Sequence, residues 1–414
     1  MKNVKINRTV LLILLGVLAA LGPFTIDMYL PGFQKIAADF GTDEKQVAFT
    51  LTSYFIGIAA GQLIYGPIVD KYGRKRPLIA GLVIYIIAAL GCALSPNIES
   101  MILMRLLQAL GGCVGMVASN AIISDVYEKE HRARAFSSIM LVMGVAPLIA
   151  PSVGSLLLEK TGWQYIFYFL AAFATFVAVL IMAFLPETSR YMHSRKLSIK
   201  KVSHGYLDIL KNRTFLLYTL AGSIAMSVLF AYISSSSFVF ITLYGLDKAT
   251  FSFIFAVNAA GLITGSSLNG IVTRYINYIR LTRIVAWVLG AVSFLVMMVL
   301  ILYPQLPYQW MVGGIFTILF LVGFITPNVT AASLAPFTGN AGAASALGGA
   351  MRMGVGALVA AAIGIFQGAS ALIMFVTIFV LAVLTILLLL PAAATTISSV
   401  VPSPGVEPDT TEAP

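Results

Sequence analysis

The chain has 414 residues, of which 59% are hydrophobic and 10% are charged, and its mean hydropathy is +0.95. Soluble globular chains are nearer ~45–50% apolar and ~25% charged, so the composition excludes a soluble enzyme and a nucleic-acid-binding protein. Two cysteines and three histidines are too few for a disulfide framework or for a zinc or haem site. We therefore expect neither a metal nor a cofactor.

Twelve apolar stretches follow one another along the chain. Each is long enough to cross the ~30 Å hydrocarbon core of a bilayer as a helix. They cover residues 9–31, 46–69, 77–95, 99–123, 134–158, 163–185, 214–243, 251–273, 282–303, 309–333, 340–368 and 370–391. The sequence thus predicts an all-α, multi-pass membrane protein with twelve transmembrane helices.

Lys and Arg are divided unequally between the two ends of these spans. With the N-terminus inside, twenty of the 26 basic residues fall on the cytoplasmic side and four on the other, while Arg105 and Arg352 lie within spans. Cytoplasmic loops of membrane proteins carry such an excess. The distribution predicts that both termini are cytoplasmic, and it explains the net charge of +10 without a nucleic-acid partner.

The longest polar insertion, residues 186–213, divides the spans into six plus six. An internal sequence repeat supports this division, because Ile68–Tyr72 after the second span resembles Ile271–Tyr275 after the eighth span. Two repeats of six spans around a midplane cavity are typical of transporters. The expected organisation is an N-terminal half (1–185), a cytoplasmic linker (186–213), a C-terminal half (214–391) and a disordered tail (392–414).

Asp27 is the only acidic residue well inside a span. An ionisable group in the membrane is energetically expensive, so its default interpretation is functional. Pro31 lies four residues later and has no N–H, which leaves the carbonyl of Asp27 without its helical partner. A broken helix beside a carboxyl group favours a proton-carrying role for Asp27. The alternative is that Asp27 lies near the outer end of its span and only reaches water.

Two segments carry known signatures. Gly66–Pro77 reads GPIVDKYGRKRP and resembles the G-x-x-x-D-R-x-G-R-K/R signature of the major facilitator superfamily. Ala146–Ser155 resembles the antiporter motif G-x-x-x-G-P-x-x-G-G, with small residues in place of three of its glycines. Pro151 and Gly154 match the motif, and Pro147, at one of its variable positions, is assigned to it as well.

Three further stretches narrow the resemblance. They are Pro23–Pro31, Arg105–Gly112 and Leu185–Thr188, and together they look like the Bcr/CflA group of bacterial drug:proton antiporters. The resemblance implies proton-driven export of small drugs across the bacterial inner membrane. Phenicols, sulfonamides and bicyclomycin-like compounds are the substrate range of that group.

Arg105 lies near the outer end of the fourth span, where its side chain could snorkel to the headgroups. Gln108 and Gly112 follow on the same helix face, which favours a position against protein instead. The resemblance gives Arg105 a role in proton coupling. A fixed positive charge near Asp27 would help that carboxyl group to release its proton.

The signature loop is predicted to act as a conformational latch. Arg74 is expected to pair with Asp125 at the end of the fourth span, and Asp70 with the positive N-terminal end of the eleventh span. Gly73 permits the tight turn between them. The predicted latch comprises Gly66, Asp70, Gly73, Arg74, Lys75 and Asp125.

A substrate cavity is predicted from weakly polar and aromatic residues in several spans. Its expected lining residues are Tyr29, Tyr54, Gln62, Asn120 and Phe238, with a serine run at 234–237 and Asn258 and Asn269 as further candidates. Such a wall suits neutral or mildly amphiphilic aromatic molecules.

Three functions remain open at this point. The first is a drug:proton antiporter that acts as a monomer, with a drug, protons and the lipid bilayer as its partners. The second is a proton symporter or uniporter for a small metabolite. The third is a non-transporting membrane protein, but the sequence has no HExxH motif, GxSxG nucleophile elbow or nucleotide-binding motif for an enzyme.

Overall fold

The computed structural model describes residues 8–127, 129–189, 199–337, 341–366 and 370–400. Almost all of these residues are helical, and none of them forms a strand. The elements are α1 (Arg8–Asp27), η1 (Leu30–Gly32), α2 (Phe33–Phe40), α3 (Glu44–Tyr72), α4 (Lys75–Ala93), α5 (Ile98–Val126), α6 (Lys129–Lys160), α7 (Gln164–Phe184), α8 (Ile199–Lys211), α9 (Arg213–Ser237), η2 (Phe238–Leu243), α10 (Lys248–Val272), α11 (Tyr278–Leu302), α12 (Tyr308–Leu334), α13 (Ala341–Phe366) and α14 (Leu372–Val400).

Twelve helical stretches within the described residues are long and apolar enough to cross a membrane. The predicted fold class is therefore confirmed, with the predicted spans and the observed helices differing by a few residues at their ends. The prediction of disorder from residue 392 is wrong for residues 392–400, because α14 continues through them to Val400. The alanines that follow Pro391 are strong helix formers and extend the helix. Residues 401–414, like 190–198 of the predicted linker, lie outside the described part of the chain.

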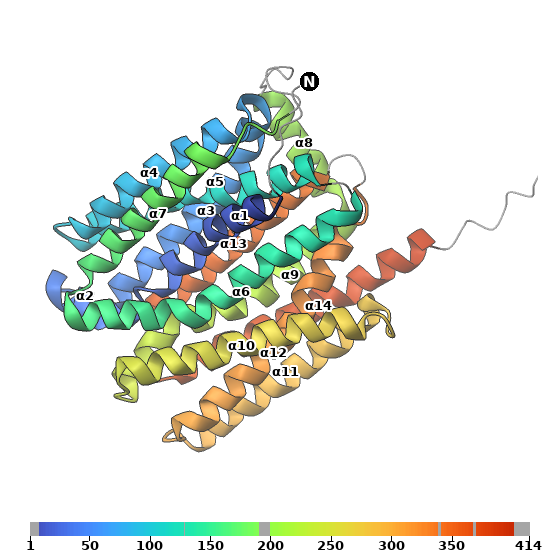
Figure 1. Cartoon of the computed structure of the whole chain (residues 1–414). Coiled ribbons are helices and arrows are strands. Elements are labelled where there is room, and N and C mark those ends of the chain that lie inside the picture. The colour runs from blue at the N-terminus through green and yellow to red at the C-terminus, as the bar shows by residue number, and fades with distance from the viewer. Residues whose placement is uncertain (1–7, 128, 190–198, 338–340, 367–369, 401–414) are drawn as a thin grey trace, which may run out of the picture.

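The spans form two six-helix halves that meet along two seams (Figure 1). In the N-terminal half, α1 packs against α6 and α7, while α5 packs against both α3 and α4. In the C-terminal half, α9 packs against α12, α13 and α14, and α12 also contacts α10 and α11. The seams between the halves are α3 against α13 and α6 against α10. We call the two ends of this bundle the α2 end and the α8 end, after the short helix that lies at each.

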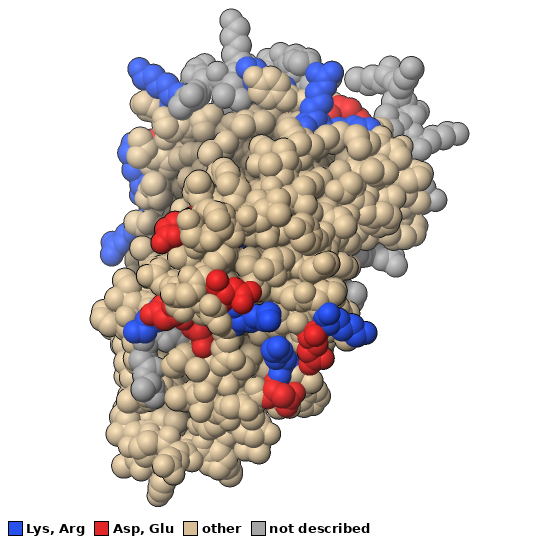
Figure 2. All heavy atoms as spheres, turned by 90° about the vertical axis from the view of Figure 1, so that its left-hand side faces the viewer, with Lys and Arg blue, Asp and Glu red and all other residues tan. Residues whose placement is uncertain are grey.

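Polar contacts join the two halves at the α2 end. The Gln34 amide donates to Thr242 Oγ1 at 2.8 Å, and the Thr242 hydroxyl donates to Glu44 Oε1 at 2.6 Å. The hydroxyl oxygens of Ser155 in α6 and Ser252 in α10 lie 2.9 Å apart. Figure 2 faces this end and shows acidic and basic side chains mixed across it. The halves are thus held together at the α2 end by bonds between polar side chains.

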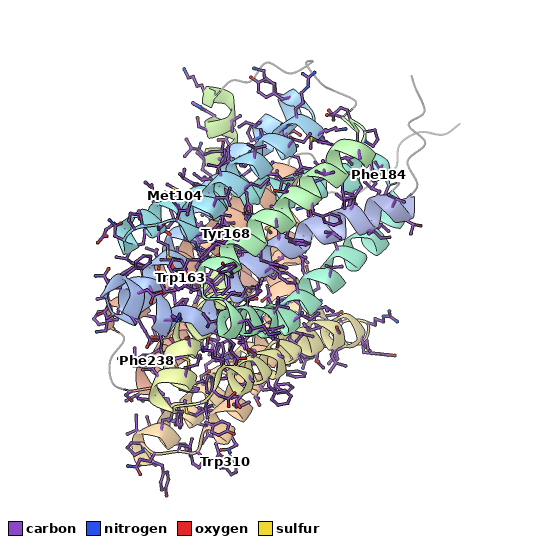
Figure 3. The ribbon with its side chains drawn as sticks, turned by 60° about the vertical axis from the view of Figure 1, so that its left-hand side comes forward. Met104, Trp163, Tyr168, Phe184, Phe238 and Trp310 are labelled. Atoms are coloured by element: carbon purple, nitrogen blue, oxygen red, sulfur yellow. The ribbon has the colours of Figure 1, made fainter. Side chains whose placement is uncertain are left out.

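Trp163 fixes α2 against the N-terminal half. Its indole N–H donates to Asp39 Oδ2 at 2.8 Å, and its ring meets Phe40 edge to face with the centroids 5.3 Å apart. In Figure 3, Trp163 and Phe238 lie toward the α2 end, whereas Phe184 lies toward the other end of α7. The short helix α2 therefore covers the region where α1 ends.

Candidate functional site

The first span is broken at its candidate functional residue. Helix α1 ends at Asp27, a turn follows, and η1 begins at Leu30 with Pro31 inside it. Proline cannot donate a backbone hydrogen bond, so the carbonyl of Asp27 lacks the partner that a continuing helix would provide. Pro23, in contrast, lies inside α1 without ending it.

The carboxyl group of Asp27 is buried at the junction of the two halves. Its side chain is only 3% exposed, and among the described residues its Oδ1 has no hydrogen-bond partner. The phenol of Tyr232 in α9 lies close enough to interact with it electrostatically. The Tyr232 oxygen in turn accepts a hydrogen bond of 3.1 Å from the Asn258 amide of α10. A carboxyl group of one half therefore lies within electrostatic range of a hydrogen-bonded polar pair of the other half.

Gly154 of the antiporter motif is placed directly against this site. A Cβ atom at residue 154 would collide with the backbone carbonyl of Met28, the residue after Asp27. Only glycine therefore allows α6 to approach the broken end of α1 this closely. Pro147 and Pro151 lie inside α6, and Ser155, next to Gly154, makes the contact with Ser252 across the seam.

Arg105 is fully buried inside the N-terminal half and does not snorkel. Its guanidinium carbon lies 4.3 Å from the Tyr29 ring centroid, 4.5 Å from that of Tyr54 and 5.7 Å from that of Phe167. Its Nη1 donates to Gln108 Oε1 at 2.7 Å, and its Nη2 donates to the Thr25 carbonyl at 3.1 Å. Aromatic faces and neutral acceptors thus stabilise this buried cation.

The expected proximity of Arg105 to Asp27 is not found. No ion pair joins the two within the described residues, and Arg105 reaches α1 through Thr25 instead. Thr25 and Asp27 are two positions apart in the sequence, so on a helix their side chains point about 200° apart around the axis. The Thr25 hydroxyl faces Tyr85 of α4, so Asp27 faces away from that side. A direct effect of Arg105 on the Asp27 proton therefore has no contact to act through.

Two of the predicted cavity residues belong to this arginine cage. Tyr29 is fully buried, its hydroxyl is paired with Thr50, and its ring packs on Arg105. Tyr54 is also buried and packs on the same guanidinium. The structure thus places both rings in the packed interior of the N-terminal half, because the guanidinium needs their faces in the absence of a carboxylate.

The other predicted cavity residues are placed differently from one another. Gln62 of α3 is buried at the seam, where a Cβ atom at Gly349 of α13 would collide with its carboxamide. Asn120 of α5 is exposed, and Phe238 is partly buried at the start of η2. The Ser234–Ser237 run is entirely buried. Gln62 therefore lies where the halves meet.

Arg74 is the centre of a polar cluster at the α8 end. Its Nε donates to Asp125 Oδ2 at 2.9 Å, and its Nη1 donates both to Asp70 Oδ1 at 3.0 Å and to the Val69 carbonyl at 2.7 Å. The Thr188 hydroxyl donates to the same oxygen of Asp125 at 3.2 Å. Burial alone would lower the pKa of Arg74, but its bonds to Asp125 and Asp70 raise that pKa overall.

Glu187 belongs to this cluster and was missed as a functional residue in the sequence. Its two carboxylate oxygens accept hydrogen bonds from the backbone N–H groups of Arg74 at 2.8 Å and Lys75 at 3.1 Å, at the start of α4. Gly73 has φ +86°, and a Cβ atom there would lie 2.5 Å from the Glu187 carboxylate. The sequence signal was the Leu185–Thr188 stretch, which the resemblance singled out without giving its glutamate a role.

The predicted pairing of Asp70 with the N-terminus of the eleventh span has no described contact. The Asp70 side chain is 51% exposed and pairs with Arg74, four residues later in the sequence. Residues 338–340, which precede α13, lie outside the described part of the chain. Two motif residues remain. Gly66 lies near the Tyr206 hydroxyl of α8. The Lys75 ammonium group donates a hydrogen bond to the Met182 carbonyl of α7.

Comparison with known proteins assigns this arrangement to a family. The model of the Major Facilitator Superfamily matches residues 12–361. The chain belongs to the Major Facilitator Superfamily. It is accordingly a multi-pass membrane transporter and not an enzyme.

Several curated relatives extend along most of this superfamily member. An "Uncharacterized MFS-type transporter YdgK" of Bacillus subtilis is 34% identical over 381 residues, covering 90% of this chain and 93% of its own length. A "Bicyclomycin resistance protein homolog" of Haemophilus influenzae is 31% identical over 360 residues, covering 86% of this chain and 89% of its own length. A "Multidrug resistance protein MdtL" of Klebsiella pneumoniae is 31% identical over 242 residues, covering 58% of this chain and 61% of its own length.

Proposed function

We propose that this transporter exports small drugs in exchange for protons, as a Bcr/CflA-type antiporter of a bacterial inner membrane. The observation that carries the proposal is the carboxyl group of Asp27, which is buried without a hydrogen-bond partner for its Oδ1 where the two halves meet. Such a group is expensive in a membrane unless it has a function. The names of two relatives, which refer to bicyclomycin and multidrug resistance, support a drug as the substrate.

The mechanism is alternating access, in which one half rocks against the other around a central site. Opening at the α2 end breaks the bonds of Thr242 and of Ser155 to the opposite half. Gly154 and the prolines of α6 let that helix move against the broken end of α1. The Arg74 cluster acts as the conformational latch at the α8 end, with Asp125 as its principal partner.

The substrate binds between the halves, against Gln62 of α3 and Phe238 of η2, with Asn120 lining the path from the α8 end. Residues 1–185 and 214–391 are the two moving halves and 186–213 is the linker. The excess of basic residues at the α8 end supports cytoplasmic termini. A single chain contains both halves, so a monomer suffices.

The test is drug uptake driven by an imposed pH gradient in proteoliposomes. An antiporter accumulates chloramphenicol when the vesicle interior is the more acidic side, and a symporter accumulates it when the exterior is. Asp27→Asn should abolish accumulation yet keep drug binding, because it removes only the ionisable group. Asp208→Asn is the matched control, since Asp208 is an exposed residue of α8 paired with Lys211. Accumulation by Asp27→Asn at the parental rate would refute the proposed role of Asp27.

A further inference from the structure

Arg352 is a cation deep inside a span of the C-terminal half, and the spanning helices of this half contain no anion to neutralise it. Arg352 lies eleven residues into α13, about 16 Å along that helix. None of the six spanning helices of this half contains Asp or Glu. The hydrogen bond described for the Arg352 guanidinium is a long one of 3.4 Å, from Nη1 to Thr330 Oγ1. Within the described residues, Arg352 therefore has far less compensation than Arg105, which has three aromatic rings and two acceptors.

Other groups converge on the same place. A Cβ atom at Gly348 would lie 3.9 Å from Nη1 of Arg352, 3.7 Å from Cγ2 of Thr219 and 4.0 Å from the Phe215 ring. Thr219 is 2% exposed, and within the described residues its hydroxyl has no hydrogen-bond partner. The ring of Phe215 is also buried, and its centroid lies 5.6 Å from that of the Phe337 ring. The Arg352 guanidinium, the methyl group of Thr219 and the Phe215 ring thus lie within van der Waals range of the position that a side chain at Gly348 would take, and the unpaired Thr219 hydroxyl belongs to the same cluster.

The position of this cluster excludes lipid-facing snorkelling. Helix α13 is packed between α3 of one half and α9 of the other, and the cluster is formed by α9, α12 and α13. Side chains on a helix point back toward its N-terminus, which brings the guanidinium of Arg352 level with Gly348. The cation therefore faces the protein interior on the α8 side of the bundle's middle.

We propose that Arg352, Thr219 and Phe215 form a binding site for an aromatic substrate that carries one negative charge. The guanidinium offers forked donors to an anionic oxygen or nitrogen atom, the threonine hydroxyl donates a further bond, and the phenylalanine ring packs on the aryl group. Ionised sulfonamides and aryl carboxylates have this chemistry. The inference rests on the proposed export function, because the anion is assigned to the exported molecule, and it adds anionic drugs to a cavity that otherwise suits neutral ones.

The first experiment measures the charge preference of the site without any drug. Thr219→Cys, in a chain with Cys92→Ala and Cys113→Ala, is reacted with an anionic (sulfonatoethyl) or a cationic (trimethylammonioethyl) methanethiosulfonate. The thiolate displaces methanesulfinate and forms a disulfide. We expect the anionic reagent to react faster, and the ratio of the two rates to fall at least tenfold when Arg352→Gln is added. Arg283→Gln, which removes an exposed arginine of α11, is the control and should leave the ratio unchanged. No reaction, or a ratio independent of Arg352, would overturn the proposal.

The second experiment compares two drugs that differ in charge. The purified protein in neutral detergent is titrated with sulfamethoxazole at pH 8, where the drug is ionised, and with its N-methylated derivative, which cannot ionise. A hydrogen bond to a charged group contributes about 1.5–3 kcal/mol, so Arg352→Gln should weaken sulfamethoxazole binding by about 10-fold to 100-fold and derivative binding by less than twofold. Arg352→Lys should give an intermediate affinity. Equal losses for both compounds would contradict the site.

A third measurement separates this inference from the export proposal and from lipid binding. Arg352→Gln should still accumulate chloramphenicol in response to a pH gradient. If the parent protein accumulates no drug, the export proposal fails, whereas the thiol experiment still decides the anion site. Phosphatidylglycerol is also tested as a competitor of sulfamethoxazole, with phosphatidylcholine as the control lipid. If phosphatidylglycerol alone competes, and Arg352→Gln abolishes the competition, the site binds lipid headgroups and the proposed substrate is overturned.

Discussion

Asp27 and Asp125 are acidic residues of the same half, but their surroundings are opposite. Asp125 accepts hydrogen bonds from Arg74 and from Thr188 at the α8 end. Asp27 is more deeply buried, and among the described residues its Oδ1 has no partner at all. Removing the partner of a paired, partly buried carboxylate destabilises the protein, because it leaves an isolated charge. A carboxyl group without partners contributes little stability and is free to exchange a proton.

The same contrast separates the two ends of the bundle. At the α8 end, Arg74, Asp125 and Glu187 form charge-assisted bonds within the N-terminal half and the start of the linker. At the α2 end, the hydroxyls of Thr242 and Ser155 bridge the two halves, and of these bridging bonds only that from Thr242 to Glu44 involves a charged group. Charge-assisted bonds are roughly twice as strong as neutral ones. Most of these charge-assisted bonds thus lie at the α8 end, whereas the bonds between the halves at the α2 end are neutral except for that from Thr242 to Glu44.

The largest loss of stability should follow Arg74→Ala, which removes the cation that pairs with the Asp125 carboxylate. Arg74→Ala leaves Asp125 with Thr188 as its described side-chain donor, in a position where 17% of the carboxylate side chain is exposed. Breaking a buried ion pair costs about 3–5 kcal/mol, and partial exposure reduces this to about 2–3 kcal/mol. The measurement is the free energy of unfolding in mixed detergent micelles.

Lys211→Ala provides the control for Arg74→Ala. Lys211 pairs with Asp208 at 3.0 Å, but both side chains are more than 70% exposed. Its removal should leave the unfolding free energy unchanged, because solvent screens such pairs. Equal losses for the two variants would show that the Arg74 cluster is an ordinary surface network.

A smaller loss is expected from the capping carboxylate. Glu187→Ala leaves two backbone N–H groups at the start of α4 without their acceptor, and helix caps contribute about 0.5–2 kcal/mol. Glu187→Gln should recover part of this loss, because its amide oxygen can accept one of the bonds. Glu99→Ala is the matched control, since Glu99 lies in the first turn of α5, where Asn97 caps the helix. A loss for Glu99→Ala as large as that for Glu187→Ala would indicate a general helix-dipole effect.

The fold was predictable from the sequence because membrane spans are read from local composition. Twenty apolar residues in a row cannot avoid the bilayer, and their helices need no knowledge of tertiary contacts. The pairing of Arg74 with residue 125 was also accessible, since both lie at the same end of neighbouring spans. Local composition likewise singled out Asp27 as the acidic residue inside a span.

The environment of each site residue was harder to predict. Arg105 was expected beside Asp27, but the face that each helix turns toward its neighbours depends on tertiary packing. Tyr29 and Tyr54 read as cavity residues because an aromatic ring suits a drug as well as it suits a guanidinium. Glu187 is 113 residues away from Arg74 in the sequence, and no local pattern reports a bond to a distant backbone N–H. Periodicity identifies helices, whereas partners emerge only when the helices are packed.

The smallest change in stability should come from Asp27→Asn, and it sharpens the comparison most. The amide keeps the shape of the carboxyl group, and no described hydrogen bond or ion pair is lost, so the unfolding free energy should change by less than the ~1 kcal/mol of a typical hydrogen bond. Asp125→Asn, the matched change at the paired carboxylate, weakens the acceptor of both Arg74 and Thr188 and should destabilise the protein clearly. Transport should show the reverse order, with pH-driven accumulation abolished by Asp27→Asn and retained in part by Asp125→Asn. A large loss of stability in Asp27→Asn would mean that Asp27 is a structural residue whose partner forms in another state of the transport cycle, and the contrast between the two carboxyl groups would then disappear.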